Sequence, residues 1–170
     1  MAEATPDKKI AAAIKAMDSG DFKKAYTAFK KLCTELPENA EVWYYKAECG
    51  NYASGMFGAK VDPEEIMEAY RKAIELDGER VDYYQSYGQF CISINKYEEA
   101  EKAYCEAAEM DESMSASLYS EFAIEYYNNM MATYGEIMED PKARAPAGKK
   151  ALSYLLKAID MSPEEAKSLL

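Results

Sequence analysis

The stretch Asn95-Lys-Tyr97-Glu-Glu-Ala100-Glu-Lys-Ala-Tyr104-Cys-Glu-Ala107 decides the fold, because its spacing of aromatic and small residues recurs along the chain. Its marked positions follow one another at intervals of three, four and three residues. Such intervals place side chains on one stripe of a helix, where alanine lets a neighbouring helix approach closely. The stretch therefore predicts a helix that packs tightly against another helix.

The same pattern occurs in three more places. The first copy contains Phe22, Ala25, Phe29, Leu32 and Pro37, the second contains Pro63, Ile66, Tyr70, Ala73 and Gly78, and the fourth contains Gly148, Ala151, Leu155, Ala158 and Pro163. A second helical stripe precedes each copy, and before the third copy it includes the small residue Gly88. Because no segment alternates in twos over a strand length, we expect about eight main helices and no sheet.

Helix starts and spacing set the expected boundaries. Asp62-Pro63-Glu64-Glu65 and Ser162-Pro163-Glu164-Glu165 each offer a capping oxygen, a proline at the first helical position and a carboxylate that reaches back. We expect one domain over residues 1–170, with helix pairs at 6–39, 40–80, 81–114 and 115–163 and a short terminal helix at 163–170.

The second and fourth pairs are longer than the third, which indicates insertions within them at 50–61 and about 128–148. We expect a flexible connection in the first insertion because it contains Gly55 and Gly58. In the second, Pro141 and Pro146 discourage regular structure, so we expect an irregular, mobile segment there.

These helix pairs resemble the tetratricopeptide repeat family, whose unit is a helix pair of roughly 34 residues with small and aromatic residues at fixed positions. The likeness covers nearly the whole chain, although Lys46 and Gly50 stand where the family pattern has large residues. The resemblance implies an all-α fold, a right-handed superhelical stack of antiparallel helix pairs. It also implies a concave groove, lined by the first helix of each pair, that takes extended peptides or helices.

Composition narrows the classes of function. The chain has 20 basic and 31 acidic residues, a net charge of −11, and no histidine. The negative charge disfavours nucleic acid and anionic membrane surfaces as partners. Without histidine, the side chain most used for proton transfer and metal binding near neutral pH is missing, so we expect no enzyme, no metal and no cofactor.

The four cysteines stand singly, at Cys33, Cys49, Cys91 and Cys105, with no C-x-x-C pair. We interpret them as reduced, half-buried small residues, because free cysteine usually behaves in this way. No apolar run reaches the length of a membrane span, and the first residues lack the apolar core of a signal peptide. These features favour a cytoplasmic protein.

The resemblance assigns partner-binding residues by register. They are Ile14, Met17, Glu41, Tyr44, Glu48, Tyr52, Asp82, Gln85, Gln89 and Tyr127. Together they form an apolar, aromatic and acidic set. Chaperone adaptors of the family hold a C-terminal carboxylate with lysine and asparagine, but the matching positions here, which include Ile10, Tyr45 and Ser86, supply no cation. We therefore expect that carboxylate clamp to be missing.

The resulting hypothesis is a protein–protein interaction module or scaffold, which binds an apolar or basic-amphipathic peptide segment in an acidic and aromatic groove. A second hypothesis, by similarity to small acidic repeat chaperones, is a protein that shields an aggregation-prone client. The two differ in whether the groove suppresses aggregation of many apolar peptides or binds one sequence. The sequence leaves the partner's identity and the oligomeric state open.

Overall fold

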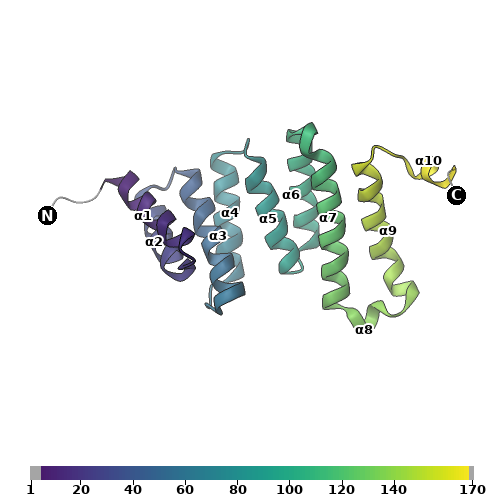
Figure 1. Ribbon diagram of the computed structural model, residues 1–170, viewed down its shortest axis with the longest axis horizontal. Helices are drawn as coiled ribbons and strands as arrows, with labels where there is room; N and C mark the ends of the chain where they lie inside the picture. The colour runs from purple at the N-terminus through teal and green to yellow at the C-terminus, as the bar shows by residue number, and fades with distance from the viewer. Residues whose placement is uncertain (1–4, 169–170) are drawn as a thin grey trace. The chain divides into compact units, whose positions relative to one another are not determined.

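The computed structural model describes residues 5–168, apart from the side chain of Phe57, and their regular structure is entirely α-helical (Figure 1). The helices are α1 Pro6–Asp18, α2 Phe22–Glu35, α3 Ala40–Phe57, α4 Pro63–Leu76, α5 Val81–Ser93, α6 Tyr97–Met110, α7 Glu112–Thr133, α8 Gly135–Met138, α9 Pro141–Ala158 and α10 Pro163–Ser168. The prediction of an all-α fold built from helix pairs is thereby confirmed.

The helix starts follow the caps in the sequence. Asp62 accepts a hydrogen bond from the N–H of Glu64 at 3.0 Å and begins α4. At α10 the predicted reciprocal cap forms, because the N–H of Ser162 donates to Glu165 at 2.8 Å and the N–H of Glu165 donates to the Ser162 hydroxyl at 3.2 Å. Helix α7 begins at Glu112, before the expected position 115, because Asp111 caps it.

The chain divides into two compact units, Met1–Tyr83 and Tyr84–Leu170. In the first unit α1 packs on α2, α2 on α3 and α3 on α4. Phe29, Val42 and Ile66 are fully buried there, and small residues such as Ala25 let the helices approach. Each interior is thus built by helices that follow one another in the chain.

A buried cation marks the interior of the first unit. Lys46, which stands where the family pattern has a large apolar residue, is only 7% exposed, and its ammonium lies 3.1 Å from a carboxylate oxygen of Glu65. Lys30 lies 2.8 Å from the same oxygen. Burial alone raises the pKa of Glu65, but hydrogen bonds from the two lysines outweigh it and lower that pKa to about 2. The buried charge is therefore paired.

The second unit contains the closest helix approach that the sequence predicts. Gly88 of α5 faces the buried ring of Tyr104 on α6, and a Cβ atom at Gly88 would lie 2.7 Å from a ring carbon. Behind that ring, Phe122 of α7 contacts Tyr104 at 5.6 Å and Tyr154 of α9 at 4.8 Å between ring centroids. Aromatic rings thus fill the spaces that the small residues leave.

The first insertion is helical over residues 50–57, so the expectation of a flexible connection was wrong for that part, and residues 58–61 connect α3 to α4. Residues 50–57 continue α3, which ends where Gly58 adopts a left-handed φ of +59° and the N–H of Ala59 donates to the carbonyl of Ala53 at 2.9 Å. Gly50 lies close to Tyr26 and Ile66, since a Cβ atom there would come within 3.1 Å of both. Most of the insertion therefore lengthens α3.

The second insertion is also largely helical, against the expectation of an irregular segment. Helix α7 continues to Thr133, α8 follows, and α9 begins at Pro141 and passes through Pro146. Pro141 occupies the first turn, where its missing N–H is not needed, and Asp140 caps the helix by accepting from the N–H of Lys142 at 2.9 Å. Pro146 lies about one turn further along, and α9 continues through it to Ala158.

Candidate protein-interaction surfaces

The first unit places six of the predicted residues on α1 and α3. Ile14 and Met17 of α1 are half-buried and pack against the core, so only part of each side chain is accessible. On α3, Glu41, Tyr44, Glu48 and Tyr52 share one face, because they follow one another at intervals of three or four residues. The α3 face, as we name these four residues, is the part of the predicted groove that this unit contains.

The two tyrosines of the α3 face are held by other rings. Tyr44 stacks on Tyr83 with 4.5 Å between ring centroids, and Tyr52 stacks on Phe22 at 4.9 Å. Tyr52 is nevertheless 43% exposed. Rings fixed in this way present apolar area to a ligand at a small cost in side-chain entropy.

The acidic groups of this region are partly engaged within the chain. The hydroxyl of Tyr70 donates to Glu48 at 2.5 Å, and burial together with that carboxylate raises the pKa of Tyr70 well above its ordinary value. Asp82 accepts two hydrogen bonds from Arg80, at 2.9 and 2.7 Å. Glu41 is exposed and accepts a weaker bond of 3.3 Å from the hydroxyl of Tyr45. Glu48 and Asp82, by contrast, are half-buried.

The second unit joins Gln85 and Gln89 through a residue that the sequence did not single out. The side-chain amides of these glutamines donate to the two carboxylate oxygens of Glu121 at 2.6 and 2.5 Å, and the hydroxyl of Tyr104 donates to Glu121 at 2.7 Å. Burial and this carboxylate raise the pKa of Tyr104. Glu121 lies one turn before Glu125 on α7. Because glutamates are common on helices, the sequence gives no sign that Glu121 accepts hydrogen bonds from three side chains.

Tyr127 lies in a different place, in a groove between α7 and α9 with a volume of about 280 Å³. Its apolar and small lining residues are Ile124, Tyr127, Gly148, Ala151, Leu152 and Leu155. Ile124, Leu152 and Leu155 are 51%, 56% and 38% exposed. The sequence pattern placed Ala151 and Leu155 on a helix-packing stripe and did not identify this groove.

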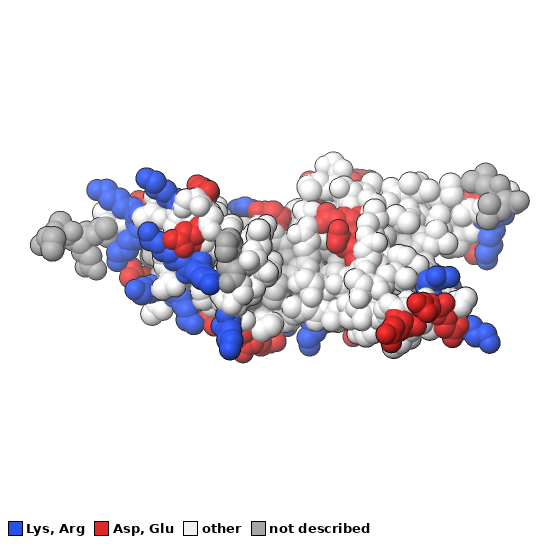
Figure 2. Space-filling model, turned by 60° about the horizontal axis from the view of Figure 1, so that its bottom comes forward, with Lys and Arg blue, Asp and Glu red and all other residues white. Residues whose placement is uncertain are grey.

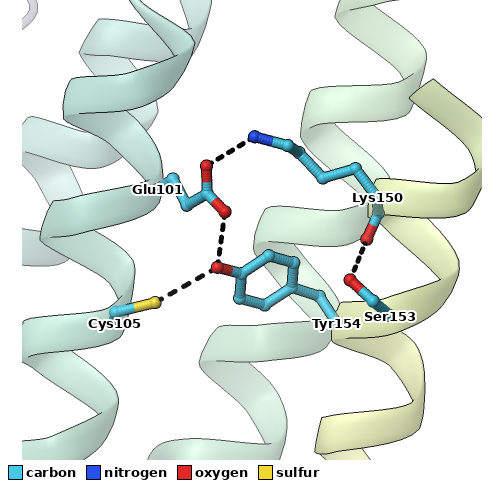
Figure 3. A network of polar contacts seen from close by, with 5 residues as sticks. All are labelled: Glu101, Cys105, Lys150, Ser153 and Tyr154. Atoms are coloured by element: carbon cyan, nitrogen blue, oxygen red, sulfur yellow. Dashed lines mark hydrogen bonds and ion pairs between the residues drawn. The ribbon is translucent and has the colours of Figure 1, made fainter. Parts of the chain in front are cut away.

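A polar network fastens α9 to α6 on the other side of that helix, as Figure 3 shows. Glu101 accepts hydrogen bonds from the ammonium of Lys150 at 2.6 Å and from the hydroxyl of Tyr154 at 2.7 Å, and Cys105 lies 3.4 Å from the same hydroxyl. Burial favours a higher pKa for Glu101, but the hydrogen bonds from Lys150 and Tyr154 outweigh burial, so the pKa of Glu101 is lower than its ordinary value. The network fixes α9 in place.

Three structural features bear on the other predicted classes of site. Within residues 5–168 no three or more cysteine, aspartate or glutamate side chains come together in a way that could hold a metal ion. None of the described helices combines the length and apolarity needed to cross a membrane. The four cysteines are unpaired, and three of them are buried.

Comparison with known proteins supports the repeat assignment. Residues 81–114 match the sequence profile of the tetratricopeptide repeat family. A search of curated proteins found no match. Among solved structures, the MamA protein is similar over 97% of this chain and 96% of its own, with 19% identity and a TM-score of 0.60.

Two further structures share the fold. The pilF protein of Pseudomonas aeruginosa aligns with 95% of this chain at 20% identity and a TM-score of 0.57, and this chain spans 64% of its length. PilW, a type IV pilus biogenesis factor, aligns with 95% of this chain and 80% of its own at 15% identity and a TM-score of 0.56. We conclude that the chain contains a tetratricopeptide repeat at residues 81–114, within an all-α fold of the tetratricopeptide type.

Proposed function

We propose that the chain is a protein-interaction module that binds a basic amphipathic segment of a partner on the α3 face. A tetratricopeptide repeat supports a role in protein interaction. The observation that carries the finer proposal is the combination on α3 of two braced tyrosine rings with an exposed carboxylate, Glu41. Aromatic side chains supply much of the binding energy at protein interfaces, and charged groups at the rim select the partner.

Contacts within the chain support a division of roles among these groups. Asp82 is paired with Arg80, and Glu48 accepts a hydrogen bond from Tyr70, so we assign the contact with a partner's cation to Glu41. Tyr52 supplies exposed ring surface. Because exposed charges are screened over roughly 8 Å at physiological salt, added salt weakens the cationic contact and leaves the aromatic one largely intact.

A titration with a labelled amphipathic peptide tests the proposal. The peptide carries leucines at helical spacing and lysines on its flanks, and binding is followed by fluorescence anisotropy. We expect Tyr52→Ser and Glu41→Lys each to weaken binding several-fold, whereas Tyr134→Ser, which replaces a similarly exposed tyrosine outside the α3 face, has no effect. Indifference to both variants would remove the α3 face as the binding surface.

The chaperone hypothesis stays a prediction, tested by different behaviour. A chaperone role requires that the protein suppress aggregation of unrelated apolar peptides at stoichiometric concentration. Selective binding of one class of peptide without such suppression supports the interaction module instead.

A further inference from the structure

A pocket of about 510 Å³ lies beside α9 on the side where that helix is fastened to α6. We name it the α9 lysine pocket. Its polar lining residues are Glu101 of α6 and Lys149, Lys150, Ser153, Tyr154 and Lys157 of α9. Three of them are lysines and one is acidic, in a chain whose net charge is −11. The pocket therefore has the opposite charge from the chain as a whole.

Helix geometry gathers these lysines around Ser153. Lys149 lies four residues before Ser153 and Lys157 lies four residues after it, so each is about one turn, roughly 6 Å, from the serine on the same face of α9. A lysine carries its ammonium group on a flexible stem of four carbons. Both ammonium groups can therefore reach one anion that lies over Ser153.

The carboxylate in the pocket is already neutralised from within the chain. The side chain of Lys150 extends across to Glu101, where its ammonium lies 2.6 Å from a carboxylate oxygen (Figure 3). Neither Lys149 nor Lys157 forms an ion pair with a carboxylate in the part of the chain that the structure describes. The pocket thus retains two positive charges for which residues 5–168 supply no acidic partner.

Aromatic rings hold one of these two cations beside the pocket. The ammonium of Lys157 lies 4.5 Å from the ring centroid of Tyr154 and 5.4 Å from that of Tyr119, although the residue is exposed. Contacts of this kind attract the cation to the ring and restrict the side chain. Because Lys157 is partly fixed before an anion binds, less side-chain entropy is lost on binding.

The amount of unpaired charge indicates the class of anion. A phosphate group on a serine carries roughly 1.5 to 2 negative charges at pH 7 and offers three acceptor oxygens, so it matches two ammonium groups better than a single carboxylate does. The net charge of −11 disfavours nucleic acid and anionic membranes. A single phosphate group, by contrast, responds mainly to charges within roughly 8 Å at physiological salt.

The other lysine-rich part of the chain lacks this arrangement. Residues 6–36 carry seven lysines and four acidic residues, and Figure 2 shows basic and acidic side chains interspersed over α1 and α2. Lys9 is paired with Glu35 at 2.7 Å, and the pocket at the start of α2 is lined by one lysine and one aspartate. The α9 lysine pocket is therefore the better candidate for an anion.

We propose that the α9 lysine pocket binds a phosphate group carried by a serine of a partner peptide, with Lys149 and Lys157 as the groups that bind it. The proposal shares with the α3 face only the role in protein interaction that the tetratricopeptide repeat supports. It does not rest on the basic segment proposed for that face.

Three peptides of one sequence test the chemistry of the ligand. They differ at one position, which is phosphoserine, glutamate or serine, and NMR titration of the full ¹⁵N-labelled chain measures each Kd. We expect the phosphoserine peptide to bind about tenfold more tightly than the glutamate peptide, to shift the amide signals of α9, and to lose affinity as salt rises. If the phosphoserine peptide binds no more tightly than either of the other two, the proposal is overturned.

Two substitutions test the groups that bind the phosphate. Lys149→Gln and Lys157→Gln should each raise the Kd of the phosphoserine peptide about tenfold, because each removes one charge-assisted hydrogen bond. Lys31→Gln is the matched control, since Lys31 is likewise exposed and lies outside the pocket, on α2. An equal rise of Kd in the Lys31 control would show a response to net charge alone and would refute the pocket.

A substitution in the opposite direction separates binding from a loss of structure. Glu101→Gln removes the negative charge nearest the pocket and frees Lys150, while its amide oxygen still accepts the hydrogen bond from Tyr154. We expect it to lower the Kd of the phosphoserine peptide several-fold, with circular dichroism confirming unchanged helix content. An unchanged or higher Kd in this folded variant contradicts the proposal.

Two further outcomes identify other sites or ligands. Tyr52→Ser should leave the Kd of the phosphoserine peptide unchanged, and a loss of binding there would assign that peptide to the α3 face and overturn the proposal. Inorganic phosphate should displace the peptide only at concentrations well above the peptide's own Kd. Displacement at the same concentration would identify a free phosphate compound as the ligand and overturn the assignment to a peptide.

Discussion

Replacing Gly88 with alanine tests the close approach of α5 to the ring of Tyr104 in the second unit. The new Cβ atom would lie 2.7 and 2.8 Å from two ring carbons of Tyr104, distances at which one of the groups must move. The ring has little freedom to move, because it is fully buried and its hydroxyl is bonded to Glu121. Overpacking of this kind costs about 1–3 kcal/mol, against a gain of about 1 kcal/mol from replacing glycine within a helix.

The same substitution at another helical glycine serves as a control, because it brings the same gain in helix propensity. Gly55 lies in α3, and a Cβ atom there would meet nothing within 4 Å, so Gly55→Ala changes helix propensity without a clash. We expect Gly88→Ala to have a free energy of unfolding about 1–3 kcal/mol lower than Gly55→Ala, measured by urea denaturation and circular dichroism. If the two variants are equally stable, the ring of Tyr104 can move aside without loss of stability. The close approach of α5 and α6 would then not restrict the residue at position 88.

Three further perturbations test the polar contacts and the thiols. The pKa of Glu65 is lowered to about 2 in the folded chain, so the stability that this group contributes is present above its ordinary pKa of 4.5 and is lost as pH falls toward 2. Glu65→Gln should therefore reduce the acid-dependent loss of stability, which pH-resolved urea denaturation measures. Tyr154→Phe removes a hydrogen bond to Glu101 and should cost about 1 kcal/mol in thermal or urea unfolding. A thiol reagent at neutral pH should label the half-buried Cys105 before the buried Cys49, whose pKa burial raises to about 12, and mass spectrometry of the labelled peptides gives the order.

Helix pairing could be predicted from the sequence because it depends on residue size at fixed spacing. The contact between Gly88 and Tyr104 follows from such a pattern, and so do the caps at Asp62 and Ser162. Each of these features depends on residues close together in the sequence or recurs along the chain, so the same pattern can be recognised several times in one sequence. The fold class was therefore accessible without a structure.

The insertions were mispredicted because the effect of a proline or a glycine depends on its position in a helix, and the sequence pattern did not give that position. Pro141 occupies a helix start, where it fits, and Gly50 lies where neighbouring side chains come within 3.1 Å of its missing Cβ. The network around Glu121 could not be predicted for another reason. Its partners, Gln85 and Tyr104, come from two other helices, and no spacing along one helix brings them together.

The net charge of −11 led the sequence reasoning to expect basic partners throughout, but net charge governs only long-range attraction. At physiological salt, exposed charges act over roughly 8 Å, so a docked segment responds mainly to the side chains of the helix that it touches. Helix α9 carries only cations, whereas the exposed charge on the α3 face is the carboxylate of Glu41. One chain therefore presents opposite charges on different helices. Its sum of charges describes neither helix.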